Sequence, residues 1–357
     1  MTALAWLAPW LLGIGVWLVA CGWPRRRAAW CAAAGGGWLL GNLAIGLALG
    51  GLQWAVSPQA TVRVIGPWVL ALGVLLTMLA WRWRRSAVTA CPEPPLTWFG
   101  RALIGLLLML LALRWGWMWQ QATLPPLFPW DAWAAWSVKP AVWFSLDQWV
   151  PFVDASQWLS SADRGLYTSA AAGYPAWLGR LELWYAAGMG CWCDLAYTRL
   201  WPALWLALLL ALYGLLRGLG VGRLIAVLAV YVLGSLPLLD VHAAMAGYAD
   251  LWLAAYLVLG VLLWLHAWRL GGRARAALAV LLVLALPAVK LEGAVWMLLV
   301  LAAMAFALLP LRWRQRVVRW GAVAMAVLWL AVFVAGLPLP VPGLGLVYVD
   351  GSGLHVP

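Results

Sequence analysis

Apolar runs of about 20 residues recur along this chain of 357 residues and are separated by short clusters of arginine. A helix needs about 20 predominantly apolar residues to cross the hydrocarbon core of a bilayer. Only 10% of the residues are charged, whereas a soluble domain carries about 25%. We therefore predict an all-α, polytopic membrane protein with about ten transmembrane helices.

A long, less hydrophobic segment interrupts the apolar runs. Residues 120–197 form this segment and hold most of the acidic side chains. They are predicted to be a large outer loop with interfacial helices. The predicted organisation is a three-helix membrane block (1–97), a membrane domain with the outer loop (98–337) and an irregular outer tail (338–357). The spans are predicted at 3–23, 29–50, 65–82, 98–119, 198–216, 224–240, 249–268, 275–290, 293–310 and 319–337.

The arginines orient these spans. No basic residue precedes the first apolar run and Arg25–Arg27 follow it, which predicts a retained helix with an external N-terminus. Alternating the spans from there places 16 of the 21 arginines on one side. Loops rich in Lys and Arg face the cytoplasm. Ten of the eleven acids then lie at or near the other face, with Glu93 as the exception. We expect an integral plasma (inner) membrane protein with its active site on the outer, periplasmic side.

The net charge of +12 would suggest nucleic-acid binding in a soluble protein. Here the arginines sit in short clusters between apolar runs, which is how membrane topology is encoded. No nucleic-acid partner is therefore expected.

The first motif with candidate chemistry is the segment 129–139, PWDAWAAWSVK. At 100° per residue, one helix face collects Trp130, Trp133, Trp136 and Trp143. Asp131 and Lys139 lie on the other face, about 12 Å apart, so each is available for another partner. The pattern predicts an interfacial helix with its tryptophans in the headgroup layer and the two charges facing away from it. The alternative is an aromatic belt with solvated charges.

A second motif is the segment 174–184, YPAWLGRLELW. The proline after Tyr174 suits the first turn of a helix. Arg180 and Glu182 would then lie on a second short interfacial helix. The competing interpretation is a re-entry segment with surface charges.

The third motif, residues 240–250, is predicted to be a short outer loop that carries His242 between Asp240 and Asp250. Asp250 stands where a helix begins, so it could simply interact with the unpaired N–H groups there. A divalent-metal site made from these three residues is a minor alternative. The five cysteines show no CxxC pairing, so no zinc site and no certain cofactor are expected.

The fourth motif places Lys290 and Glu292 between two apolar runs, near the outer surface. Charged residues at such a depth often have a function. Two interpretations of this motif remain open: either Lys290 neutralises a phosphate, or the segment is a tight turn with a local ion pair. The predicted topology brings all four motifs to one face of the membrane.

The ordered set of motifs resembles a bacterial GT-C glycosyltransferase, distantly like the dolichyl-phosphate-mannose–protein mannosyltransferases. The resemblance covers residues 98–310 and rests on Trp130-Asp131…Lys139, Tyr174-Pro175…Glu182, Gly247-Tyr248-Ala249-Asp250 and Lys290-Leu291-Glu292-Gly293. It implies a polyprenyl-phosphate-linked sugar donor, a glycan, lipid or protein acceptor, and Asp131 as the catalytic base. The chain departs from the family in two ways. The acid follows the fourth span rather than the first, and Ala132 stands where many members have a second acid.

The chemistry of such a transfer fits the candidate residues. A phosphate leaving group needs little general-acid help, so a base for the acceptor hydroxyl and cations for the phosphate remain. Asp131 suits the first task, and Lys139, Lys290 or Arg180 suits the second. Tyr174, Glu182, His242, Asp250 and Glu292 complete the expected substrate contacts. The alternatives are a transporter or flippase for a lipid-linked or small polar solute, and a structural membrane subunit.

Overall fold

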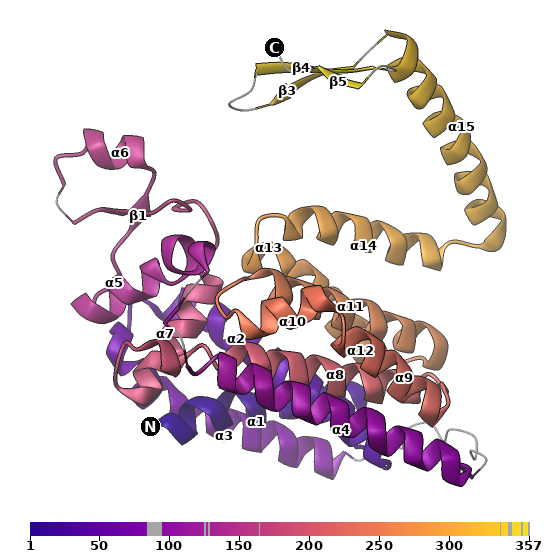
Figure 1. Ribbon diagram of the computed structural model, residues 1–357, viewed down its shortest axis with the longest axis horizontal. Helices are drawn as coiled ribbons and strands as arrows, with labels where there is room; N and C mark the ends of the chain where they lie inside the picture. Colours follow the sequence, from indigo (N-terminus) through magenta and orange to yellow (C-terminus); the bar gives the residue numbers. More distant parts are fainter. Residues whose placement is uncertain are drawn as a thin grey trace. The chain divides into compact units, whose positions relative to one another are not determined.

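The computed structural model describes residues 1–83, 95–124, 126–127, 129–163, 165–335, 337–341, 345–350 and 353–355. The protein is about 78% helical and nearly all-α (Figure 1). The long helices are α1 (Thr2–Cys21), α2 (Arg27–Leu52), α3 (Thr61–Arg82), α4 (Trp98–Gln121), α8 (Leu200–Gly218), α11 (Asp250–Leu270) and α15 (Leu311–Ala335). The shorter ones are α5 (Val138–Leu146), α6 (Ala155–Ser160), α7 (Trp177–Met189), α9 (Arg223–Gly234), α10 (Pro237–Ala244), α12 (Arg273–Leu284), α13 (Leu286–Val289) and α14 (Gly293–Leu308). Single turns are η1 (Pro58–Ala60), η2 (Ala132–Trp136) and η3 (Asp194–Ala196).

The chain divides into two compact units, Met1–Val300 and Leu301–Pro357. The first holds the helix bundle and a two-stranded parallel ladder of β1 (Phe152–Val153) and β2 (Tyr167–Thr168). The second holds α15 and an antiparallel sheet of β3 (Leu337–Val341), β4 (Gly345–Asp350) and β5 (Gly353–His355). The tail 338–357, predicted to be irregular, therefore contains three strands. Its alternation of β-branched and leucine residues with Pro and Gly also suits short strands joined by turns.

Within the part of the chain that the structure describes, seven helical segments are long and apolar enough to cross a membrane, by length and composition. They correspond to seven of the predicted spans. Many of their large apolar side chains are exposed, including Leu106, Leu108, Met109 and Leu113 on α4. Surfaces of this kind are rare on soluble monomers. The seven segments are Thr2–Cys21, Arg27–Leu52, Pro58–Arg82, Trp98–Gln121, Asp194–Gly218, Asp250–Leu270 and Leu311–Val334.

The other three predicted spans are broken or short. The span at 224–240 splits into α9 and α10, which are bent by 62°. Pro237 begins α10, and a proline has no N–H to continue the preceding helix. The span at 275–290 splits near Pro287 into α12, with 12 residues, and α13, with 4. Helix α14, at 293–310 in the prediction, has 16 residues.

The N-terminal helices pack at very short range. Helix α1 contacts both α2 and α3, and α2 contacts α8. A Cβ at Gly13 would lie 1.8 Å from the Gly37 carbonyl oxygen, and one at Gly41 would lie 1.7 Å from the Pro9 carbonyl oxygen. Only glycine allows backbones this close, as in the small-residue interfaces of membrane helices.

An aromatic cluster fills the bundle directly below the start of α11. The Trp252 ring lies 5.4 Å from Trp38, 5.4 Å from Trp177 and 6.3 Å from Trp201. Tyr256 lies 5.7 Å from Trp177. Stacked and edge-to-face aromatic pairs stabilise beyond the burial of their area. The cluster therefore gives the first turn of α11 a rigid base.

The two predicted interfacial helices differ from expectation. Residues 130–143 do not form one α-helix, because a π-helical turn (η2) precedes α5. The change of register turns Trp136, Trp143 and Lys139 inward, with 5%, 6% and 5% exposed surface, while Trp130 and Trp133 stay exposed. The tryptophans therefore do not share one face.

Helix α7, which was predicted to be the second interfacial helix, is buried in the core of the bundle. Its Trp177 and Trp184 are fully buried, and their indole N–H groups donate to the carbonyl oxygens of Leu43 (3.2 Å) and Ala5 (2.9 Å). Aromatic residues with a satisfied N–H suit a buried position as well as an interface. The spacing of aromatic and polar residues along the sequence therefore does not distinguish a buried helix from an interfacial one.

The first unit has two chemically different ends. Helix α11 begins at Asp250 and ends near Arg269, about 30 Å away at 1.5 Å per residue. His266, in its last turns, contacts Gly218, and its Nε2–H donates a hydrogen bond to the Leu215 carbonyl oxygen. Arg275 donates to the Cys21 carbonyl oxygen. Arginines thus gather at the end opposite Asp250.

Candidate functional site

Lys290 lies at a break between two helices. Helix α13 ends at Val289, Lys290 is extended (φ −153°, ψ 147°), and the chain turns into α14 at Gly293. A Cβ at Gly293 would lie 2.2 Å from the Leu286 carbonyl oxygen, so the turn requires glycine. The break carries the Lys290 side chain out of the helical path toward the start of α11.

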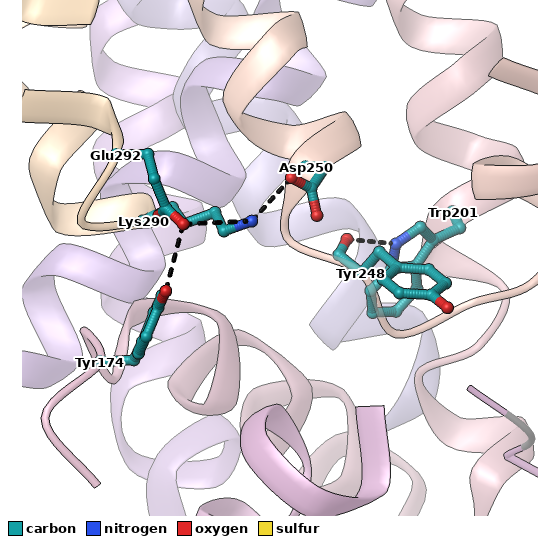
Figure 2. Close-up of polar contacts among 6 residues, drawn as sticks. All are labelled: Tyr174, Trp201, Tyr248, Asp250, Lys290 and Glu292. Atoms are coloured by element: carbon teal, nitrogen blue, oxygen red, sulfur yellow. Dashed lines mark hydrogen bonds and ion pairs between the residues drawn. The ribbon is translucent and has the colours of Figure 1, made fainter. Parts of the chain in front are cut away.

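The Lys290 ammonium group joins two carboxylates (Figure 2). Its Nζ lies 2.7 Å from Oδ1 of Asp250 and 3.8 Å from Oε1 of Glu292. The Tyr174 hydroxyl donates to the same Glu292 oxygen at 3.1 Å. Burial opposes the charge of Lys290, but the hydrogen bond to Asp250 and the nearby carboxylates raise its pKa. Tyr174, Asp250, Lys290 and Glu292 are called the acid–lysine cluster below.

Asp131 lies beside this cluster. Gly247 has φ +115°, and a Cβ there would lie 2.2 Å from the Cβ of Ala132, so the Gly247–Asp250 turn packs on the Asp131 segment. Burial, the Glu292 hydrogen bond and the charges of Glu292 and Asp131 raise the pKa of Tyr174. Among the described residues, no group makes a hydrogen bond or ion pair with the half-buried Asp131 carboxylate. Asp131 thus keeps its acceptor capacity.

Lys139 supports the loop that carries Tyr174. Its buried Nζ donates to the carbonyl oxygens of Ala172 (2.9 Å) and Tyr174 (2.8 Å). The Trp136 ring packs edge-on against Tyr174 at 5.4 Å. Burial and then the positive charge of Arg180 lower the pKa of Lys139 to about 8. Lys139 therefore positions the loop that carries Tyr174 by donating hydrogen bonds to two of its backbone carbonyl oxygens.

Arg180 is a half-buried cation on α7. Within the part of the chain that the structure describes, it has no ion pair with a carboxylate, and its Nε has no hydrogen-bond partner. Burial lowers its pKa. Guanidinium groups bind phosphate oxygens with two parallel hydrogen bonds. Arg180 is therefore better suited to an incoming anion than Lys290, whose charge two carboxylates already offset.

Glu182 is fully buried in α7, so it is not a direct substrate contact in this conformation. Neither of its oxygens has a hydrogen-bond partner among the described residues, and neither does Ser137 Oγ. Burial raises the pKa of Glu182 to about 8, with the nearby Ser137 hydroxyl opposing the shift and the charge of Asp194 adding to it. The side chain is therefore largely protonated at neutral pH.

The residues considered for a metal site do not converge. Asp240 pairs with Arg114 at 3.4 Å, and Asp250 pairs with Lys290. His242 Nδ1 lies 2.8 Å from the Leu238 carbonyl oxygen, and its ring packs on Tyr248 at 5.1 Å. Among the described residues, no group of three His, Cys, Asp or Glu side chains could hold a metal ion.

Sequence reasoning missed three contacts that shape the site. Trp201 Nε1 donates to the Tyr248 carbonyl oxygen at 2.9 Å and holds the Gly247–Asp250 turn (Figure 2). Asp194 accepts from the Leu127 backbone N–H at 2.7 Å and so anchors the approach to Asp131. Gly247 makes the close approach to Ala132 described above. Two sequence signals were available for these contacts. Gly247 stands shortly before a helix start, and Asp194 stands at the start of a span.

The fold and the site define a class of protein: a helical membrane protein with the acid–lysine cluster at one end of its bundle and arginines at the other end. A comparison with known protein families, with curated proteins and with solved structures finds no match for this chain.

Proposed function

We propose that this protein is a membrane glycosyltransferase that moves a sugar from a polyprenyl-phosphate-linked donor to an acceptor hydroxyl. One observation carries the proposal. Four motifs far apart in sequence meet at one end of the first unit, where Asp131 lies beside the acid–lysine cluster without a hydrogen-bond or ion-pair partner among the described residues. Their order along the chain is the order that resembles the GT-C glycosyltransferases.

Asp131 is the general base in this proposal. Its carboxylate accepts the proton of the acceptor hydroxyl as the oxygen attacks the anomeric carbon and the bond to the phosphate breaks. The lipid phosphate leaves with the bonding electrons and needs only cationic stabilisation. In this proposal a sugar face stacks on Tyr174, which is hydrogen-bonded to Glu292, and on the exposed Trp130 and Trp133.

Arg180 takes the phosphate in this arrangement, and Lys139 and Lys290 hold the site together. Arg180 lacks a carboxylate partner among the described residues, whereas Lys139 supports the Tyr174 backbone and Lys290 binds Asp250. An arginine on one side and an acid on the other would orient the donor across the cluster.

The active end is assigned to the outer side of an inner membrane. Support comes from the arginines at the opposite end of the first unit, because basic loops face the cytoplasm. The proposal keeps ten spans, with α9–α10, α12–α13 and α14 as broken or short crossings. Irregular backbone at membrane depth is tolerated where it is buried or lines a cavity.

A transporter or flippase is the second candidate. Its support is Glu182, a buried acid with a pKa raised to about 8 in the bundle. Buried acids with a raised pKa can serve as proton relays in transporters. A transporter would move its solute without cleaving it.

One experiment separates the two candidates. Purified protein is incubated with a panel of radiolabelled polyprenyl-phosphate sugars and a mixed acceptor pool, in detergent and in sealed vesicles. Release of free polyprenyl phosphate with label on an acceptor supports the transferase. Movement of intact solute across the vesicle membrane without cleavage supports the transporter and rejects the proposal.

A further inference from the structure

Two cysteines lie close to the segment that leads to Asp131. Cys191 and Cys193 follow the end of α7 and precede η3, which begins at Asp194. Both thiols are free, and both residues are partly exposed, so a reagent in solution can reach them. The pair is therefore accessible and stands directly before the residue that anchors the approach to Asp131.

The two thiols are close enough to react with each other. One residue separates them, and Cα atoms two positions apart lie at most about 7 Å from each other. A disulfide needs Cα atoms about 4.4–6.8 Å apart, and the chain bends at Cys191. A hydrogen bond with Cys193, burial and the charge of Cys193 raise the pKa of the Cys191 thiol to about 11. Cys191 therefore keeps its proton while it contacts Cys193.

A disulfide between residues this close in sequence is strained, because its ring contains a single intervening residue. Departure from the preferred geometry makes a disulfide easier to reduce. Strained or exposed disulfides are the labile and regulatory ones, whereas structural disulfides resist reduction. The pair is therefore suited to reversible oxidation more than to a permanent cross-link.

The segment next to the pair holds the approach to Asp131. Asp194 accepts hydrogen bonds from the Leu127 N–H at 2.7 Å and from the Tyr197 hydroxyl at 3.1 Å. Trp192, between the two cysteines, stacks on Tyr197 with 5.0 Å between the ring centroids. Closing a ring across Trp192 changes the backbone directly before Asp194. Oxidation is therefore expected to weaken the hydrogen bond between Asp194 and Leu127.

We propose that Cys191 and Cys193 form a redox-active dithiol that exchanges with a small-molecule disulfide, such as oxidised glutathione, and loosens the approach to Asp131 when it is oxidised. The Cys193 thiol releases its proton to water, and the thiolate attacks one sulfur of the external disulfide. The half that leaves takes the Cys191 proton. The Cys191 sulfur then displaces the second half from Cys193, and this second thiolate takes a proton from water. Two protein thiols and one external disulfide thus give one protein disulfide and two small thiols. The exchange does not depend on sugar transfer.

Redox titration of the purified protein tests the proposal. The protein in detergent is equilibrated in mixtures of reduced and oxidised glutathione, quenched with acid, alkylated under denaturing conditions and digested with trypsin. Cleavage after Arg180 and Arg199 gives the peptide 181–199, in which Cys191 and Cys193 are the two cysteines. In oxidising mixtures this peptide should lose both alkylated thiols and be two hydrogen atoms lighter than the dithiol. In reducing mixtures it should regain both thiols.

Hydrogen exchange tests the link to the candidate site. The Leu127 N–H should exchange about tenfold or more faster in the oxidised protein, because it loses a hydrogen bond to a charged group. The variant Cys191→Ser/Cys193→Ser cannot close the ring, so its Leu127 N–H should exchange at one rate in both buffers. The single variant Cys191→Ser should accumulate a mixed disulfide with glutathione at Cys193.

Four results would overturn the proposal. A peptide 181–199 that stays a dithiol in the most oxidising mixture removes the exchange. Glutathione on both cysteines without ring closure removes the internal disulfide. An unmodified Cys193 in Cys191→Ser removes its role as the attacking thiol. Equal exchange of the Leu127 N–H in the reduced and the fully oxidised protein removes the link to Asp131.

Discussion

The Lys290 ammonium lies 2.7 Å from Asp250 Oδ1 and 3.8 Å from Glu292 Oε1, so one cation serves two carboxylates. The pair ties the break before α14 to the first residue of α11. It also gives the side chain of Asp250, the first residue of α11, a hydrogen-bond and ion-pair partner in Lys290. The lysine is consequently a structural partner of the acids more than a free site for phosphate.

The first prediction concerns which cation holds the donor phosphate. Arg180→Gln should weaken the binding of a polyprenyl-phosphate sugar by about 10- to 100-fold, since a hydrogen bond to a charged group contributes about 1.5–3 kcal/mol. Lys290→Met should weaken it less than about fivefold, because two carboxylates offset its charge. Equilibrium binding of labelled donor measures both, and a larger effect of Lys290→Met would reverse the assignment.

A second prediction concerns the close contact below the site. Gly247→Ala should destabilise the protein by about 1–3 kcal/mol and lower turnover, because its Cβ collides with Ala132 at a positive φ. Gly190→Ala is the matched control: it also has a positive φ (+80°) but no atom within 4 Å of the added Cβ. Thermal unfolding and turnover are measured for both. A loss of turnover in both variants alike would mean that the contact with the Asp131 segment is not what matters.

The buried acid predicts a pH dependence of stability. The folded pKa of Glu182 is about 8, above its unfolded value of about 4.3. Its stabilising contribution is therefore fully present below about pH 4.3 and is lost as pH rises through the folded pKa. Relative to Glu182→Gln, the wild-type protein should lose up to about 1.4 kcal/mol per pH unit between pH 5 and 8.

This pH dependence of stability is tested by measuring denaturation midpoints of both proteins at several pH values in one detergent. The Glu182→Gln variant lacks the titrating group, so the difference between the two proteins isolates its contribution. A constant difference from pH 5 to 8 would show that Glu182 is already ionised in the folded protein.

The orientation in the membrane gives a fourth prediction. In a cysteine-free background within sealed cells, Ser160→Cys should react with an impermeant thiol reagent added outside. Arg273→Cys should react only after the membrane is opened. Both positions are exposed, so burial does not confuse the result. Labelling of both from the same side would exclude the proposed topology.

Much of the helical fold was predictable because bilayer thickness sets a length that apolar runs either meet or fail to meet. Seven of the ten predicted spans match described helices that are long and apolar enough to cross a membrane. The breaks near Pro237 and Pro287 were less visible, because hydropathy averages over a proline that interrupts the backbone hydrogen bonds. Arg84 and Arg85, two of the 16 arginines that orient the spans, and Glu93, the one acid placed on the arginine side, lie outside the described residues.

The candidate site was predicted in part. Tyr174, Asp250, Lys290 and Glu292 do meet, since charged groups at the ends of apolar runs are drawn into pairs. The roles of Lys139 and Glu182 were not predictable, because a π-helical turn and a buried helix redirected both side chains. Helical spacing gives the face of a side chain, but the tertiary packing decides whether that face meets water, lipid or protein.

Asp131→Asn tests the central claim most directly. The substitution keeps the shape of the side chain and removes the base, so the protein should fold and bind donor as the wild type does. Turnover should fall by about 10²–10⁴-fold, the usual contribution of a general base. Asp154→Asn and Asp163→Asn are the controls, since both acids are exposed in the same loop. Asp147 is less suitable, because it accepts hydrogen bonds from Ser57 Oγ and the Gln59 N–H.

The measurement is sugar transfer from a polyprenyl-phosphate donor under single-turnover conditions, with donor binding recorded for each variant. The account predicts a slow Asp131→Asn protein with normal donor affinity and two control variants with near wild-type rates. Wild-type turnover in Asp131→Asn would contradict the assignment of this carboxylate as the base.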